Sequence, residues 1–179
     1  QVDHAFSRPE ILLWTALVDY TEAGQRRALW EKIRKHTDRI HRDGSLKSVI
    51  TANPGDYIYP DPRTEALLIH LRDCGKKVFL LTNSEWEYTH AMMNTVLGRD
   101  ESRGTEWLDL FDVVVAQGNK PSYFDPVRGK NATAGVTDKV LIGGNLTEIE
   151  DRLGCAGPEI LYVGDHIYAD LLANNACGT

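Results

Sequence analysis

Residues 77–84 read Lys-Val-Phe-Leu-Leu-Thr-Asn-Ser, a short apolar run that passes directly into three polar residues. An apolar run without alternation is typical of a strand buried on both faces, as in a parallel sheet covered by helices. The flanking residues have helical spacing, with one helix at 64–72 that ends at Cys74-Gly75 and another at 88–97. The stretch therefore predicts a helix–strand–helix unit.

Two further apolar runs, at 111–116 and 160–163, predict strands later in the chain, and a helix is expected to start near 147 between them. Strands that alternate with helices indicate the α/β class, with a Rossmann-like doubly wound parallel sheet. The polar, Gly-containing segment 119–134 is expected to be a loop over one edge of the site.

The N-terminal part has a different character. Residues 8–42 have apolar residues at helical spacing and predict two helices separated by a polar break near Gly24. Residues 44–62 are rich in Gly, Pro, Asp and Asn, which predicts a linker or hinge. We therefore expect a mainly helical cap region over 1–56 and an α/β core over 57–179.

Composition restricts the partners and the compartment. The 179 residues have a formal net charge of -6 and a pI near 5.5, and Lys and Arg look scattered rather than gathered into one stripe, so no nucleic-acid partner is expected. The odd number and wide spacing of Cys74, Cys155 and Cys177 favour reduced thiols in a cytoplasmic protein. No apolar run approaches the ~20 residues of a membrane span, and no signal peptide is recognisable, so no membrane partner is expected.

Polar residues follow each predicted strand, where ligands bind in open parallel sheets. Thr82-Asn83-Ser84 follow the first strand and offer hydroxyl and amide donors to a phosphate oxygen, although a helix N-cap is the alternative. Lys120 follows the second strand in Asn119-Lys120-Pro121 and could hold a phosphoryl group, although most loop lysines are simply solvated.

The third strand is followed by Gly164, Asp165 and, five residues later, Asp170. The first Asp can ligate a hard cation such as Mg²⁺ and the second can orient a lysine or a water, with a helix cap as the alternative for one of them. Gly164 permits close approach of the backbone. We do not assign His166 as a ligand, because Mg²⁺ prefers oxygen.

In chain order these three clusters resemble motifs two, three and four of the haloacid dehalogenase superfamily. The similarity is closest to the cytosolic purine 5′-nucleotidase family, which includes the IMP-GMP-specific enzymes, and it covers most of the chain. The similar segments are residues 77–84 with Tyr88-Thr89, 111–112 leading to 120–121, 143–145 and 160–170, together with 6–10 and 41–47, which resemble the cap region.

The resemblance implies a role for each matching residue. It implies a phosphate site at Thr82, Asn83, Ser84 and Lys120, a Mg²⁺ ligand at Asp165, and catalytic roles for Lys120 and for Asp170, which would orient that lysine. It also implies a purine nucleoside monophosphate as substrate and a possible homo-oligomer.

The first motif of the superfamily is Asp-x-Asp, whose first Asp attacks phosphorus and whose second acts as general acid and base. The sequence has no Asp-x-Asp, and its N-terminal candidates Asp3 and Asp19 have no Asp two residues on. Because this motif precedes the cap in the family, we expect an N-terminally truncated fragment that is inactive and marginally soluble by itself.

The predicted function is therefore Mg²⁺-dependent hydrolysis of purine nucleoside 5′-monophosphates through an aspartyl-phosphate. Two alternatives remain open: a nucleotidase-like binding or scaffold protein without turnover, and a related phosphatase that acts on another small phosphate ester. Three aromatic residues could stack on a base, but their helical spacing favours the core instead; they are Trp14, Tyr20 and Trp30.

Overall fold

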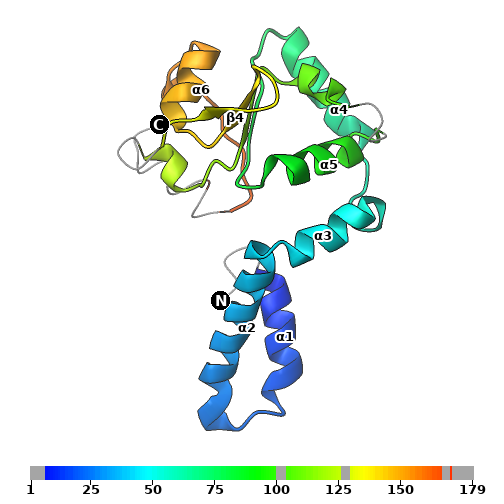
Figure 1. Ribbon diagram of the computed structural model, residues 1–179, viewed down its shortest axis with the longest axis vertical. Coiled ribbons are helices and arrows are strands. Elements are labelled where there is room, and N and C mark those ends of the chain that lie inside the picture. The colour runs from blue at the N-terminus through cyan, green and yellow to red at the C-terminus, as the bar shows by residue number, and fades with distance from the viewer. Residues whose placement is uncertain (1–6, 100–103, 126–129, 167–169, 171–179) are drawn as a thin grey trace.

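The computed structural model describes residues 7–99, 104–125, 130–166 and 170, and it has a mixed α/β fold with a small four-stranded sheet (Figure 1). This confirms the α/β class, whereas the Rossmann-like, doubly wound arrangement stays a prediction. The helices are α1 (Arg8–Val18), α2 (Arg26–Arg42), α3 (Ser45–Ala52), α4 (Pro62–Asp73), α5 (Trp86–Val96) and α6 (Leu146–Leu153). The strands are β1 (Phe79–Leu81), β2 (Val113–Ala116), β3 (Thr133–Ala134) and β4 (Val140–Ile142), and the short 3₁₀ helices include η5 (Glu106–Leu110) and η6 (Ser122–Phe124).

The sheet has the strand order β1-β2-β4-β3. Strands β1, β2 and β4 are parallel, with Leu80 opposite Val114 and Val115 opposite Leu141, and β3 is antiparallel to β4. Sequence reasoning found β1 and β2 but missed β3 and β4, because β3 has only two residues and the apolar run at β4, 140–142, is shorter than the run 78–81 that contains β1. The segment 119–134, expected to be a loop, ends in β3 and contains η6, and its residues 126–129 lie outside the described part.

Helices cover both faces of the sheet. On one face, α6 supplies Ile149 and Leu153 to a core that includes Val113, Val115 and Leu141. On the opposite face, Val114 and Val140 pack against residues of α4, α5 and η5. Neighbouring residues of β2 thus point to opposite faces, and all four are buried, which is why this strand reads as a continuous apolar run.

The third predicted strand, at 160–163, is wrong. The segment is not assigned to the sheet, and its side chains divide by position: Ile160 and Tyr162 pack against the α6-side core, whereas Leu161 and Val163 are 84% and 82% exposed. Only one face of this segment is covered. Within the described residues β1 pairs with β2 alone, so the other edge of β1 has no strand beside it.

The predicted linker at 44–62 is also wrong in part, because α3 occupies its first half. Asp43 starts this helix by accepting hydrogen bonds from the Ser45 backbone N–H at 3.0 Å and from the Ser45 hydroxyl at 2.7 Å. Gly44 takes a positive φ of 77°, which glycine adopts without strain. The local turn chemistry therefore favours a helix start rather than an open linker.

Helices α1 and α2, separated near Gly24 as predicted, form a hairpin that extends from the α/β core, and α3 connects it to that core (Figure 1). Ile33 and Thr37 of α2 are buried in the hairpin, and Trp14 and Trp30 are partly buried. Tyr20 is 91% exposed, so its prediction as a core residue is wrong. It lies beyond the end of α1, in the turn that leads to α2.

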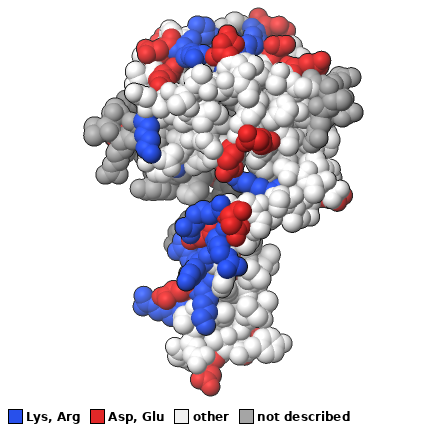
Figure 2. All heavy atoms as spheres, in the orientation of Figure 1, with Lys and Arg blue, Asp and Glu red and all other residues white. Residues whose placement is uncertain are grey.

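The cations are not scattered. Seven of the 20 Lys and Arg residues belong to α2, a helix of 17 residues, and Figure 2 shows them gathered on the hairpin. The scattered distribution expected from the sequence is therefore wrong in part: one helix contains seven of these residues, and the other 13 lie elsewhere in the chain. None of the described helices is both long and apolar enough to cross a membrane. Cys74 and Cys155 are free thiols, and Cys177 lies outside the described residues.

Candidate functional site

The loops that follow β1 and β2 lie against each other. The Gln117 N–H donates to the Ser84 carbonyl oxygen at 2.9 Å, and the Gly118 N–H donates to the Thr82 carbonyl oxygen at 2.9 Å. The approach is close, because a Cβ at Gly118 would lie 2.7 Å from Leu81 Cδ1 and 3.4 Å from the Thr82 carbonyl oxygen, so a larger residue would displace the Leu81 side chain. The carboxyl ends of two parallel strands thus bring two of the predicted clusters together.

The side chain of Asn83 holds the backbone of Lys120. Asn83 Oδ1 accepts from the Lys120 N–H at 2.6 Å, and Asn83 Nδ2 donates to the Lys120 carbonyl oxygen at 3.1 Å. The loop is tight, with positive φ angles of 53° at Gln117 and 56° at Asn119. The amide of Asn83 therefore fixes the point from which the lysine side chain starts.

Thr82 makes a local contact that leaves one donor free. Its Oγ1 accepts from the Ser84 N–H at 3.1 Å, so the hydroxyl hydrogen can still be donated to a ligand. The N-cap position of α5 is Glu85 rather than Thr82 or Ser84, so the helix-cap interpretation of this cluster is wrong.

Lys120 and Asp170 form a direct ion pair. Lys120 Nζ donates to Asp170 Oδ1 at 2.7 Å, and the side chains of Lys120 and Asp170 are 13% and 3% exposed. The other carboxylate oxygen, Oδ2, accepts from the His166 backbone N–H at 3.0 Å. Lys120 is not a solvated loop lysine. The structure brings Lys120 together with Asp170, 50 residues further along the chain, and with Asn83 of the preceding loop.

Opposing effects act on the pKa values of this pair. Burial raises the pKa of the Asp170 carboxyl, but hydrogen bonds from Lys120 and from the His166 N–H, with the ammonium charge, outweigh burial and hold that pKa below its ordinary value. Burial lowers the pKa of Lys120, but hydrogen bonds to Asp170 and Tyr162 outweigh it and raise the pKa above its ordinary value. Both groups are therefore charged at neutral pH.

Asp165 stands apart from this pair. Its side chain is exposed and, within the described residues, makes no hydrogen bond or ion pair. Among the residues placed by the structure, no three His, Cys, Asp or Glu side chains form a metal-binding group. Residues 167–169 of the predicted motif lie outside the described part. Asp165 thus offers a single unshared carboxylate.

Gly164 lies directly against Asp170, as the sequence suggested. A Cβ at position 164 would lie 2.5 Å from Asp170 Cγ. We expect Gly164→Ala to displace Asp170 and to lower the free energy of unfolding by about 2 kcal/mol, since overpacking a filled site forces neighbours to shift. Urea unfolding measures this change. Gly24→Ala is the control, because a Cβ there has no heavy atom within 4 Å; equal stability of the two variants would contradict the prediction.

Sequence reasoning missed two contacts of the site. The Tyr162 hydroxyl bonds both Lys120 and Asp170, but position 162 was predicted as an ordinary strand residue. Lys47 of α3 forms an ion pair with Glu85, beside Ser84, and lies over the Tyr88 ring. The contacts of Tyr162 with Lys120 and of Lys47 with Glu85 have no sequence signal, because they join residues 42 and 38 positions apart.

Comparison with known proteins gives two findings. Residues 1–177 match the model of the 5′ nucleotidase family. The chain is 30% identical over 171 residues to a 5′-nucleotidase domain-containing protein of Dictyostelium discoideum, an alignment that covers 87% of this chain and 29% of the relative. The chain therefore spans less than a third of that relative's length.

Proposed function

Because this chain belongs to the 5′ nucleotidase family, we propose that the protein containing it hydrolyses purine nucleoside 5′-monophosphates, with IMP and GMP as substrates and Mg²⁺ as cofactor. The observation that supports this most is the buried Lys120–Asp170 pair, held beside the loop that contains Thr82. Family membership itself supports a hydrolase of the nucleotidase kind. The free thiols Cys74 and Cys155 support a cytoplasmic location.

The proposed phosphate site uses donors that have no other partner among the described residues. Lys120 Nζ has three N–H donors, of which Asp170 and Tyr162 accept two, so the third can bind a phosphoryl oxygen. The Thr82 hydroxyl supplies a second donor. The Ser84 hydroxyl is the third candidate. For Asn83 the backbone N–H is the group that we assign to phosphate, because its side-chain amide is bonded to Lys120.

These donors would act mainly on the transition state. Phosphoryl transfer spreads negative charge over the three equatorial oxygens, and donors fixed in place before the reaction stabilise that charge without reorganisation. Asp170 does not contact the phosphate in this proposal. It keeps Lys120 charged and extended, and its burial prevents the carboxylate from turning towards solvent.

The residues present fit a magnesium ion with one protein carboxylate. Asp165 follows the 160–163 segment with an unshared carboxylate, and Mg²⁺ commonly binds one or two carboxylates together with waters and substrate phosphate oxygens. When bound, the ion would neutralise phosphate charge. We propose Asp165 as its ligand from this part of the chain.

The nucleophile is proposed to lie outside residues 1–179, since no Asp-x-Asp occurs among them. Two observations support this: no strand lies beside the outer edge of β1 among the described residues, and the side chains of Leu161 and Val163 are exposed. A further strand beside β1 would bury apolar surface and pair with the backbone of that edge. An Asp at the carboxyl end of such a parallel strand would lie at the same edge as Thr82.

The test is phosphate release from IMP and GMP in the presence of MgCl₂, with the full-length protein and with residues 1–179 alone. We expect turnover by the full-length protein only, and its loss in Asp165→Asn. Asp151→Asn, at an exposed position of α6, is the control and should retain the activity. If the full-length protein hydrolyses other phosphate esters but no nucleotide, it is a related phosphatase. If it binds nucleotides without hydrolysing any ester, it is a binding protein.

A further inference from the structure

We propose that Tyr162 is a positioning residue for Lys120, which fixes the lysine ammonium through the phenol oxygen. This inference rests on the proposed function, because it assigns Tyr162 to the same phosphate site. The Tyr162 hydroxyl accepts from Lys120 Nζ at 2.6 Å and donates to Asp170 Oδ1 at 3.1 Å. With the 2.7 Å contact between Lys120 and Asp170, the three groups form a closed triangle of hydrogen bonds.

These three hydrogen bonds fix the direction of the Tyr162 hydroxyl and of the Lys120 ammonium. A phenol has one donor, which goes to Asp170, and the oxygen that accepts from Lys120 cannot donate to it. Two of the three ammonium donors are directed by this arrangement, so the direction of the third is set as well. Burial is the main cause that raises the pKa of Tyr162, so the hydroxyl stays protonated and remains able to donate to Asp170.

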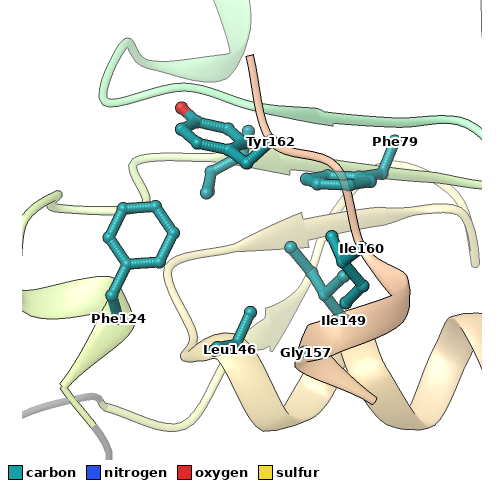
Figure 3. Close-up of a pocket in the computed structure, with 8 residues that line it drawn as sticks. Phe79, Phe124, Leu146, Ile149, Gly157, Ile160 and Tyr162 are labelled. Atoms are coloured by element: carbon teal, nitrogen blue, oxygen red, sulfur yellow. The ribbon is translucent and has the colours of Figure 1, made fainter. Parts of the chain in front are cut away.

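The Tyr162 ring is anchored independently of the lysine. It stacks on Phe79 of β1 at a centroid distance of 6.2 Å and meets Phe124 of η6 edge-on at 5.4 Å. It also lines an apolar pocket with Ile149 and Ile160, and its hydroxyl oxygen points away from that pocket (Figure 3). A ring packed on several sides holds its hydroxyl in a defined place, whereas the four-carbon stem of a lysine is flexible. The geometry therefore makes Tyr162 the fixed partner and Lys120 the positioned one.

Tyr162→Phe removes only the hydroxyl and retains the ring contacts. In the full-length protein we expect kcat for IMP to fall about tenfold with little change in KM, because a hydrogen bond to a charged group is lost while the substrate contacts remain. In a Lys120→Met background the same substitution should change the residual kcat by less than about twofold, since a residue that acts through the lysine has no effect without it. Equal losses in both backgrounds would show a general structural role and overturn the proposal.

Tyr123→Phe is the matched control. Tyr123 is buried in the same apolar core, and its hydroxyl has no hydrogen-bond partner in the described residues. It lies outside the proposed phosphate site, so its loss should leave kcat within about twofold of the wild type. A tenfold loss in Tyr123→Phe as well would show that any phenol in this core affects the rate, and would overturn the assignment to Tyr162.

A second readout does not depend on turnover. Limited acetylation followed by peptide mass spectrometry reports how readily the Lys120 amine reacts. The loss of the phenol acceptor lowers the pKa of the lysine and frees its ammonium, so Tyr162→Phe should acetylate Lys120 several-fold faster than the wild type or Tyr123→Phe does. An unchanged rate overturns the proposal. An inert protein in which Tyr162→Phe still accelerates acetylation would instead refute the proposed function and leave the contact intact.

Discussion

Lys120→Met in the full-length protein is expected to lower kcat for IMP and GMP about a thousandfold, with a much smaller change in KM. Within the described residues, Asn83 holds the backbone of this lysine beside Thr82, and a cation fixed on a transferring phosphoryl group commonly accounts for an effect of this size. Steady-state kinetics of phosphate release measure both constants.

The same substitution leaves the buried carboxylate of Asp170 without its ammonium partner. Removal of one member of a buried ion pair costs about 3 kcal/mol, so circular dichroism must show that the variant remains folded at the assay temperature. Lys76→Met is the control, because Lys76 is exposed and should contribute to neither constant. A folded Lys120→Met protein with more than a tenth of the wild-type kcat would contradict the proposed role of the lysine.

Trp107→Ala is expected to lower the free energy of unfolding by about 4 kcal/mol, the largest effect on stability that we predict. Trp107 has 0% exposure and joins two parts of the core: it stacks on Trp86 at 5.8 Å and meets Phe111 edge-on at 5.8 Å. Its indole N–H also donates to His90 Nδ1 at 3.0 Å. Truncation removes the ring and leaves a cavity between α5 and β2. Urea unfolding followed by circular dichroism measures the loss.

Trp107→Phe separates the contribution of aromatic packing from that of the hydrogen bond to His90. It retains an aromatic ring but not the donor to His90, so we expect a loss of about 2 kcal/mol, smaller than that for alanine. A loss below 1 kcal/mol for Trp107→Ala would mean that α5 and η5 do not pack on the sheet as described.

The elements that sequence reasoning predicted well are those whose pattern is determined locally. Helix α4 has an apolar face, the N-cap residue Asp61 and a glycine beyond its end, and β2 is buried on both faces. The segment 160–163 has the same apolar composition as β2, but a run of residues does not reveal whether a neighbouring strand is present to pair with it. Whether an apolar segment becomes a strand depends on a neighbouring strand that can pair with it, and the described residues contain no such neighbour for 160–163.

For the candidate site, too, the sequence indicated some residues and not others. Thr82, Lys120 and Asp170 could be selected because polar residues after buried strands meet at one edge of a sheet. The sequence did not distinguish a phosphate-binding side chain at Asn83 from one bonded to the Lys120 backbone, because both roles need the same amide group. Tyr162 was missed because its role depends on which side chains of the segment 160–163 point towards the core, and the sequence does not show this.

The concentration of cations in α2 has an electrical consequence for the whole molecule. Helix α2 contains seven basic and two acidic residues, a net +5, whereas the chain has a net charge of -6, so the remaining residues together have -11. Because the hairpin lies at one end of the long axis, these charges are separated along it (Figures 1 and 2). The molecule is therefore a macroscopic dipole. In dilute salt its positive end attracts the negative end of a neighbour and is retained on a cation exchanger despite the acidic pI, whereas at physiological ionic strength screening over ~8 Å suppresses both effects.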